Sequence, residues 1–280
     1  MKNIDLRTVA GFGREWASFN QNGFSDEDKS KIFDDYFHIF PPDKLPPNAF
    51  GADIGCGSCR WAQLVAPRVG HLNLIDASHE ELQLAKNNVF LSGNCSFHHA
   101  SVGDLSFSDN SVYLAYSLGV LHHAPETVEG VSSIAKKLKQ GSSFLVYFYY
   151  AFDNRPIWFR IMWRISDVLR RFIYCLPYIL RLILSQLIAT IIYFPLARCA
   201  RLLASWKMMP RSWPLGYYRD KSFYVMRTDA LDSFGTRLKQ RFNKRQIELM
   251  LKKLGFKYIY FSDKQPYWCA GGIKDKVCVE

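Results

Sequence analysis

The residues best placed for chemistry surround a glycine-rich turn. Asp53 opens this turn, Gly55 and Gly57 lie within it, and Asp76 ends the next apolar run 23 positions after Asp53. Glycines let the backbone turn sharply and approach a ligand closely, because no Cβ stands in the way. An acidic residue at this spacing is typical of a crevice in which a carboxylate hydrogen-bonds the ribose hydroxyls of a nucleotide. The pattern therefore predicts a nucleotide-containing ligand.

A pair of histidines could supply acid–base chemistry. His122 and His123 follow an apolar run at its carboxyl end, where a second substrate would lie. An imidazole titrates near working pH, so one of these rings could take a proton from a reacting group. The alternative is that one ring only orients the loop by hydrogen bonding to the backbone. Both interpretations stay open at the level of sequence.

Two cysteines lie in the glycine-rich turn. Cys56 and Cys59 have the CxxC spacing, but a zinc site would need a second pair at similar spacing, which the sequence lacks. We therefore predict no metal site and give a redox pair little weight. The chain has seven cysteines, an odd number spread thinly, which is typical of reduced thiols in a cytosolic protein.

Elements that would position these residues alternate along the chain. A helix is expected from the acidic stretch at 25–28 toward residue 36, and a second near residue 60, directly after the turn. The expected strands are 49–54, 72–75, 95–99, 112–116, 143–150, 258–261 and 267–272, and further helices are expected at 80–90, 126–138 and 244–254. Such alternation predicts an α/β fold: a Rossmann-like, doubly wound seven-stranded sheet with an antiparallel edge hairpin.

Four motifs in this order resemble a class I S-adenosylmethionine-dependent methyltransferase. They are Asp53-x-Gly55-x-Gly57, then Asp76, then Gly103-Asp104-Leu105, and finally the stretch from Tyr116 to His123. The resemblance is closest to the ubiquinone/menaquinone-type small-molecule methyltransferases. It covers residues 45–150 well, and residues 12–16 and 241–272 more loosely.

The resemblance implies S-adenosylmethionine as cofactor and a role for each matching residue. Asp53 and the turn residues Gly55, Cys56 and Gly57 would line the methionine portion, and Asp76 would hold both ribose hydroxyls. Ala77 would pack on the adenine, and Asp104 would accept from its amino group beside the Leu105 amide. Ser117, Leu118 and Gly119 would form the floor beneath the sulfonium, and Trp16 belongs to the looser N-terminal match. These assignments follow from the resemblance alone.

Departures from known patterns leave alternatives. The third glycine of the methyltransferase turn is Cys59 here, which should crowd the site and weaken cofactor affinity without removing it. The dinucleotide fingerprint needs its third glycine at residue 60, and that residue is Arg60, so an NAD-dependent oxidoreductase is disfavoured. A cofactor-binding protein that no longer catalyses, or a membrane-tethered interaction module, stays open.

The positive charge of the chain is concentrated in one insert. The whole chain of 280 residues has 36 Lys and Arg against 25 Asp and Glu, a formal net charge of +11. Residues 154–219 alone contain eleven of these bases and a single acid, Asp167, a net of +10. The bases are isolated among Leu and Ile rather than clustered on a polar face, which disfavours a nucleic-acid partner.

The insert is also strongly apolar. Arg160, Arg164, Asp167 and Arg171 fall on one narrow helical stripe among large apolar residues, and 16 residues from 182 to 197 carry no charge. A helix of that length reaches about 24 Å, short of the roughly 30 Å hydrocarbon core of a bilayer. Pro195 is expected to shorten it further. Three interpretations stay open: interfacial or re-entrant membrane binding through 156–213, a helical lid or dimer core, and a true span.

These observations predict three regions. An N-terminal helical cap covers 1–44, the cofactor-binding methyltransferase domain covers 45–152 and 220–280, and the basic, apolar insert covers 153–219. Residues 1–7 carry charge where a signal peptide would be apolar, so we expect a cytoplasmic protein, peripheral on the membrane if the insert binds lipid. The insert should overhang the acceptor side of the sheet, which predicts a small, lipophilic or lipid-linked acceptor. Residues 241–242 are expected to contribute to that site; the acceptor atom and oligomeric state stay open.

Overall fold

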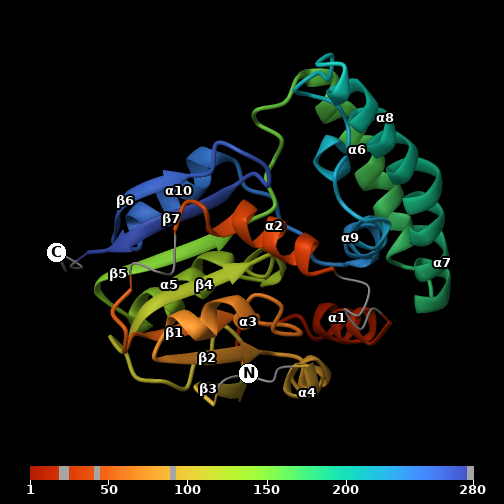
Figure 1. The fold of residues 1–280 in the computed structure, drawn as a ribbon. Coiled ribbons are helices and arrows are strands. Elements are labelled where there is room, and N and C mark those ends of the chain that lie inside the picture. The colour runs from red at the N-terminus through yellow and green to blue at the C-terminus, as the bar shows by residue number, and fades with distance from the viewer. Residues whose placement is uncertain (19–24, 41–44, 89–92, 276–280) are drawn as a thin grey trace. The chain divides into compact units, whose positions relative to one another are not determined.

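The computed structural model describes residues 1–18, 25–40, 45–88 and 93–275. The chain divides into two compact units (Figure 1). The sheet unit comprises 1–17, 30–151 and 238–280, and the helical unit comprises 18–29 and 152–237. This division differs from the three regions expected from the sequence. The helical unit extends beyond residue 219 because helix α9 (Phe223–Gly235) packs on the helices of the insert.

The sheet unit is built on seven strands in the order β3-β2-β1-β4-β5-β7-β6 (Figure 1). Neighbouring strands from β3 to β5 are parallel, whereas β7 is antiparallel to both β5 and β6. The strands are β1 Phe50–Ile54, β2 His71–Asp76, β3 Cys95–His99, β4 Val112–Leu118, β5 Leu138–Tyr147, β6 Phe256–Phe261 and β7 Cys269–Lys274. This topology confirms the predicted fold class, including the antiparallel edge hairpin.

Helices cover both faces of the sheet and explain its continuous apolar strands. One core cluster joins the sheet to α5 (Thr127–Lys137) and α10 (Lys244–Lys253). The cluster on the other face includes side chains of α2 (Asp26–Phe37), α3 (Ala62–Val65) and α4 (His79–Asn88). Parallel strands buried on both faces read as apolar runs without alternation, which is why they were recognisable from the sequence.

The helix expected near residue 60 is present but short. After a run of turns, α3 spans only Ala62–Val65 and passes into a 3₁₀ turn at Ala66–Arg68. Pro67 explains this ending, because it lacks the backbone donor that would continue the α-helical hydrogen bonds, although Ala66 before it keeps an α conformation. The turn at 53–59, rather than a long helix, therefore supplies the backbone amides that contact the end of β2.

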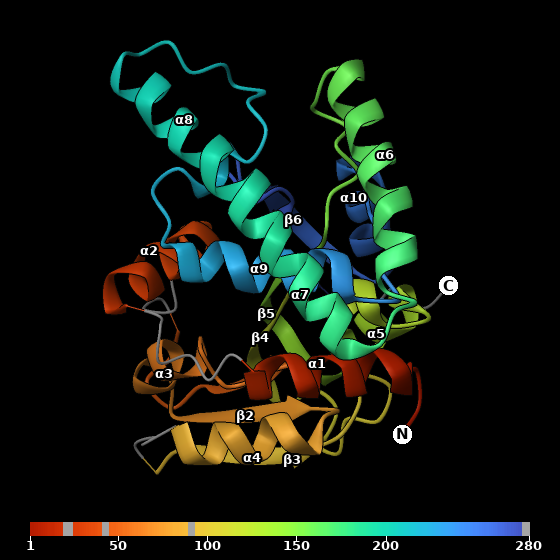
Figure 2. The same cartoon turned by 90° about the vertical axis from the view of Figure 1, so that its right-hand side faces the viewer.

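The helical unit contains α6 (Ile157–Ile173), α7 (Tyr178–Ile188), α8 (Phe194–Ser205) and α9. A π-helical turn at Ala189–Tyr193 joins α7 to α8, so helix runs without a break from Tyr178 to Ser205 (Figure 2). The expectation that Pro195 shortens the helix was wrong. Pro195 lies in the first turn of α8, directly after the π-helical turn, where wider winding accommodates the missing donor.

Candidate functional site

The glycine-rich turn after β1 has the backbone geometry that its sequence predicts. Gly55 has φ +76°, and a Cβ at this position would lie 2.4 Å from a methyl group of Val120. The Gly55 and Cys56 amides both donate to the Ile75 carbonyl, at 2.8 and 2.9 Å. The turn is thus fixed to the end of β2 and pressed against the loop after β4, which only a residue without a side chain permits.

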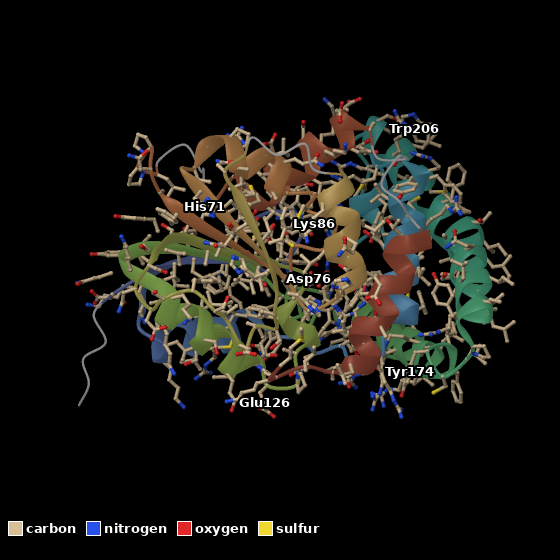
Figure 3. All side chains as sticks on the ribbon, turned by 90° about the horizontal axis from the view of Figure 1, so that it is seen from below. His71, Asp76, Lys86, Glu126, Tyr174 and Trp206 are labelled. Atoms are coloured by element: carbon tan, nitrogen blue, oxygen red, sulfur yellow. The ribbon has the colours of Figure 1, made fainter. Side chains whose placement is uncertain are left out.

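Asp76 lies at the end of β2, in the interior of the sheet unit (Figure 3). The Gly57 amide donates to its Oδ2 at 2.8 Å, and the Ser78 amide donates to its Oδ1 at 2.8 Å. Each carboxylate oxygen can accept a further hydrogen bond, since an ionised carboxylate offers about four lone-pair sites. The Asp76 carboxylate is therefore held rigidly beside the glycine turn with capacity for two hydroxyl donors.

Asp53 is buried at the end of β1, paired in register with Tyr116 of β4. Burial raises the pKa of Asp53 to about 8; the Tyr116 hydroxyl opposes this rise, and the neighbouring Asp76 carboxylate adds to it. Among the described residues, none meets full hydrogen-bond geometry with Asp53 Oδ2. Burial likewise raises the pKa of Asp76, although three backbone amides oppose the rise. Two adjacent buried carboxyl groups favour a cationic ligand between them.

Both cysteines of the turn are buried, and Cys59 has an unusual backbone conformation. Its φ is +62°, a left-handed conformation that favours glycine, which is the residue expected at this position. The neighbouring Cys59 thiol and burial raise the pKa of Cys56 well above its ordinary value, so Cys56 carries no reactive thiolate. No cluster of metal ligands occurs within the part of the chain that the structure describes.

The loop predicted to contact adenine is covered by the N-terminus of the chain. Asp104 is exposed, Leu105 is buried, and the Ser101 hydroxyl donates to the Lys2 carbonyl at 2.6 Å. A Cβ on Gly103 would lie 2.7 Å from the same carbonyl oxygen. The sequence analysis missed this contact, because an irregular N-terminal segment carries no periodic signal.

Helix α1 (Leu6–Ser18) lies close to the end of β2 and to the loop after β4. A Cβ on Gly13 would lie 3.1 Å from the Ser78 hydroxyl oxygen, at the end of β2. The preceding residue, Phe12, packs edge-to-face with the ring of His123 at 4.9 Å between centroids. The side chain of Trp16, predicted to contact the cofactor, lies outside the described residues.

The end of β4 approaches the glycine turn from the opposite side. The buried Ser117 hydroxyl donates to the Ile54 carbonyl at 2.9 Å, which joins β4 to the last residue of β1. Gly119 has φ +80°, and a Cβ there would meet open space. The strand extends to Leu118, two residues beyond the predicted end at residue 116, so β4 itself carries two of the three predicted floor residues.

The two histidines after β4 have different environments. His122 is fully buried and packs against Tyr149 at 3.9 Å between ring centroids. Burial, then the neighbouring His123, Lys239 and Arg241, hold the pKa of His122 well below its ordinary value, so the ring is neutral. Neither of its ring nitrogens has a hydrogen-bond partner among the described residues. His123 Nδ1 donates to the Leu238 carbonyl at 2.5 Å and thereby orients the loop.

The sequence analysis assigned no role to several residues of this site. They are Glu81, Tyr149 and Lys239, and also Gly13 and Val120, which lie within the stretches of the resemblance. A signal existed for Glu81, because Ser78 and Glu81 have the spacing of a capping box, and the Glu81 amide does donate to the Ser78 hydroxyl at 3.2 Å. Tyr149 and Lys239 meet only through the tertiary fold, with Lys239 Nζ 4.1 Å from the Tyr149 ring centroid.

Comparison with known proteins agrees with this geometry. Residues 52–146 match the model of a methyltransferase domain family. An O-methyltransferase of Aspergillus nomiae is 29% identical over 98 residues, which are 34% of this chain and 44% of that protein. The chain therefore spans less than half the length of this curated relative. A chain of the complex containing the Trm112 methyltransferase activator of Haloferax volcanii has a TM-score of 0.53 at 13% identity. That match covers 95% of this chain and 98% of the other and shows a shared fold.

The matched region contains most of the crevice. It begins at Ala52 and ends at Val146, and so includes the glycine turn, the Asp76 carboxylate and the end of β4. These are the parts to which the resemblance assigns the nucleoside and methionine portions of the cofactor. Residues 52–146 are thus similar to a methyltransferase domain, which supports the resemblance to class I S-adenosylmethionine-dependent methyltransferases.

Proposed function

We propose that this protein binds S-adenosylmethionine between the ends of β1, β2 and β4 and transfers its methyl group to a small acceptor. The observation that carries the proposal is the pair of buried carboxyl groups, Asp53 and Asp76, beside a turn in which Gly55 has no room for a side chain. The cofactor supplies a methyl group already activated by a positively charged sulfur. The protein must then align the acceptor with this group and exclude water, and positioning of this kind can remove about 7–11 kcal/mol of a barrier.

Each residue of the crevice has a corresponding role in this proposal. Asp76 accepts hydrogen bonds from the ribose, because its two oxygens are fixed by the Gly57 and Ser78 amides. Asp53 balances the charge of the methionine portion beside the turn. Ala77, Asp104 and Leu105 hold the adenine, and Ser117, Leu118 and Gly119 form the floor.

Calorimetry with S-adenosylhomocysteine tests cofactor binding. We expect saturable heat with the full-length protein and a loss of at least about tenfold in affinity in Asp76→Asn, because one ribose acceptor is removed. Glu129→Gln on the outer surface of α5 is the matched control and should bind as the wild type. Folded wild-type protein that gives no heat with S-adenosylhomocysteine, but is stabilised thermally by NAD, would favour the oxidoreductase alternative.

We propose His122 as the group that accepts a proton from the acceptor when the acceptor loses one. Its ring is neutral, buried and stacked on Tyr149, so a lone pair is available in a site from which water is excluded. His123 has a positioning role, since its Nδ1–H is engaged by the Leu238 carbonyl. A non-catalytic protein would bind S-adenosylhomocysteine without transferring label from S-adenosylmethionine to any cellular extract.

A second proposal concerns the helical unit, which we propose binds a membrane surface. The supporting observation is the outer face of α6. Its eight exposed apolar residues fall within an arc of about 140° when drawn at about 100° per residue. They are Ile157, Trp158, Ile161, Met162, Ile165, Val168, Leu169 and Phe172. Arg160, Arg164 and Arg171 are exposed and lie beside this arc. An apolar face bordered by cations suits an interface that contains anionic lipid.

The long helix from Tyr178 to Ser205 supports the same proposal. By length and composition it could cross a bilayer: it has 28 residues with a mean hydropathy of 1.9 in its most apolar window. However, Ala189, Tyr193 and Ala197 on its inner face pack against α9, and the Arg181 guanidinium donates to the Gly235 carbonyl at 3.0 Å. One side of this helix is thus held by α9 and by the hydrogen bond from Arg181. Such a helix is better suited to lie at the membrane interface than to span the bilayer.

Flotation with liposomes tests the membrane proposal. The variant Ile161→Glu/Ile165→Glu places two charges in the centre of the α6 arc, and we expect it to lose most binding to vesicles that contain phosphatidylserine. The matched control is Val128→Glu/Leu249→Glu, which alters two exposed apolar residues of the sheet unit. Equal flotation of both variants and the wild type would reject binding through α6. If the proposal holds, a lipophilic acceptor and a cytoplasmic, peripheral location follow as part of it.

A further inference from the structure

The segment that returns from the helical unit is fixed to the acceptor end of the sheet. The Gln240 amide donates to the His122 carbonyl at 3.0 Å, and the Phe242 amide donates to the Tyr149 carbonyl at 2.9 Å. The Ala151 amide donates in turn to the Phe242 carbonyl at 2.9 Å. Residues 238–242 therefore lie like a short extra strand between the loops that follow β4 and β5, with a defined register.

The register of this segment places two cationic side chains, Lys239 and Arg241, near the ring of Tyr149. Side chains alternate between the two sides of an extended segment, so Lys239 and Arg241 share a side and Phe242 takes the other. Phe242 packs on Phe148 in the core, at 5.1 Å between centroids. Lys239 Nζ lies 4.1 Å from the Tyr149 ring centroid, and the Arg241 guanidinium carbon lies 5.6 Å from the same centroid.

The same ring borders the proposed proton acceptor. His122 stacks on Tyr149, and both cations help to keep the pKa of His122 low, while the Arg241 guanidinium also donates to the Tyr150 carbonyl at 3.2 Å. The His122 ring is fully buried, and its two nitrogens have no hydrogen-bond partner among the described residues. Lys239 and Arg241 are half-buried, so their charges act through a medium that screens them less than water does.

We propose that Lys239 and Arg241 bind a phosphate group of the methyl acceptor over the Tyr149 ring, with the reacting end of the acceptor directed to His122. A guanidinium binds phosphate through two parallel N–H donors, and an ammonium adds a second positive charge, which together match a dianion. The phosphate could belong to a lipid headgroup or to a soluble phosphate ester. This inference rests on the proposed methyl-transfer function and adds the class of acceptor.

Calorimetry on the full-length protein saturated with S-adenosylhomocysteine tests this inference. The probes are glycerol 3-phosphate and dihexanoyl phosphatidic acid below its micellar concentration. We expect saturable binding of at least one probe to the wild type and a loss of at least about tenfold in affinity in Lys239→Gln/Arg241→Gln. The control Arg245→Gln/Lys253→Gln removes the same two charges from the exposed surface of α10 and should bind as the wild type.

A charge-conserving variant separates binding from structure. Lys239→Arg/Arg241→Lys keeps both charges, so it should retain most of the affinity, whereas a purely structural role of either side chain would not be rescued. Tighter binding of the lipid probe assigns the phosphate to a lipid, and tighter binding of glycerol 3-phosphate assigns it to a soluble ester. The inference is overturned if S-adenosylhomocysteine binds but neither probe does, or if Lys239→Gln/Arg241→Gln binds both probes like the wild type. Failure of S-adenosylhomocysteine to bind would instead remove the proposed function.

Discussion

Asp53 illustrates how a single residue can favour a ligand at the expense of stability. The folded protein keeps this carboxyl protonated up to a pKa of about 8, because burial and the Asp76 carboxylate disfavour its charge. The ordinary pKa of an aspartate is 3.8. Between pH 3.8 and about pH 8 the folded state therefore binds more protons than the unfolded state, so the free energy of unfolding falls as the pH rises. A positively charged ligand beside Asp53 offsets this cost.

We therefore predict that affinity for S-adenosylhomocysteine rises with pH. Its ammonium group favours ionised Asp53, which is scarce in the free protein below pH 8, so affinity should increase by up to about tenfold per unit between pH 6 and pH 8. Calorimetry in buffers of different ionisation enthalpy should detect proton release in this range. In Asp53→Asn the dependence should disappear, affinity should fall, and the free protein should melt at a higher temperature at pH 8 than the wild type. A pH-independent affinity in the wild type would contradict this account.

The two histidines should respond differently to substitution. His122→Ala should leave S-adenosylhomocysteine binding unchanged while lowering turnover by about 10²–10⁴-fold, the usual contribution of general base catalysis. His123→Ala breaks the hydrogen bond to the Leu238 carbonyl and should lower the free energy of unfolding by about 1–3 kcal/mol. Denaturant titration and labelled methyl transfer measure the two effects. Wild-type turnover in both variants would mean that neither ring is the base.

At the scale of elements, α1 has glycines in two different environments. Gly13 packs closely on the Ser78 hydroxyl, whereas nothing lies within 4 Å of a Cβ added at Gly11. We predict that Gly13→Val moves α1 away from the end of β2 and weakens S-adenosylhomocysteine binding, measured as a faster dissociation rate. Gly11→Val in the same helix is the matched control and should dissociate at the wild-type rate. Equal rates in the two variants would show that α1 does not cover the crevice.

Regular elements could be predicted from the sequence because their physical signals are local. Strands β1, β2, β4 and β5 read as apolar runs, and the carboxyl ends of β1, β2 and β4 carry most of the residues that the sequence analysis assigned to the cofactor. The match of residues 52–146 to a methyltransferase domain supports the predicted family and its cofactor, whereas the ubiquinone/menaquinone-type subgroup stays a prediction. The individual roles of the site residues also stay predictions.

Irregular segments could not be predicted, for identifiable reasons. Lys2 covers the loop at Gly103, and Lys239 reaches Tyr149, through contacts between residues far apart in the chain. Neither segment has a periodic pattern. The continuation of the helix through Pro195 could not be predicted, because the π-helical turn that precedes this residue has no sequence signature. The Cys59 backbone adopted the conformation of the glycine it replaces, so the site kept its geometry despite the substitution.

At the scale of the whole molecule, the charge is distributed unevenly along the chain. Residues 154–219 carry a net charge of +10 within a total of +11. We predict that raising the salt concentration from about 0.05 M to about 0.5 M releases the protein from phosphatidylserine vesicles, because screening weakens the attraction of these bases. Glu129→Lys, a charge change in the sheet unit, should not alter the salt dependence. Flotation that is unaffected by salt would assign binding to apolar contacts alone.

Two points at which the chain crosses between its units are held together within the sheet unit. The polypeptide leaves the sheet unit after Ala151 and returns at Leu238, and hydrogen bonds from Ala151 to Phe242 and from Phe242 to Tyr149 join these two points. The start and the end of residues 152–237 are therefore fixed side by side on the same unit. Lys239 and Tyr149 meet at this junction, so the backbone contacts that close it also position the side chains proposed to bind the phosphate.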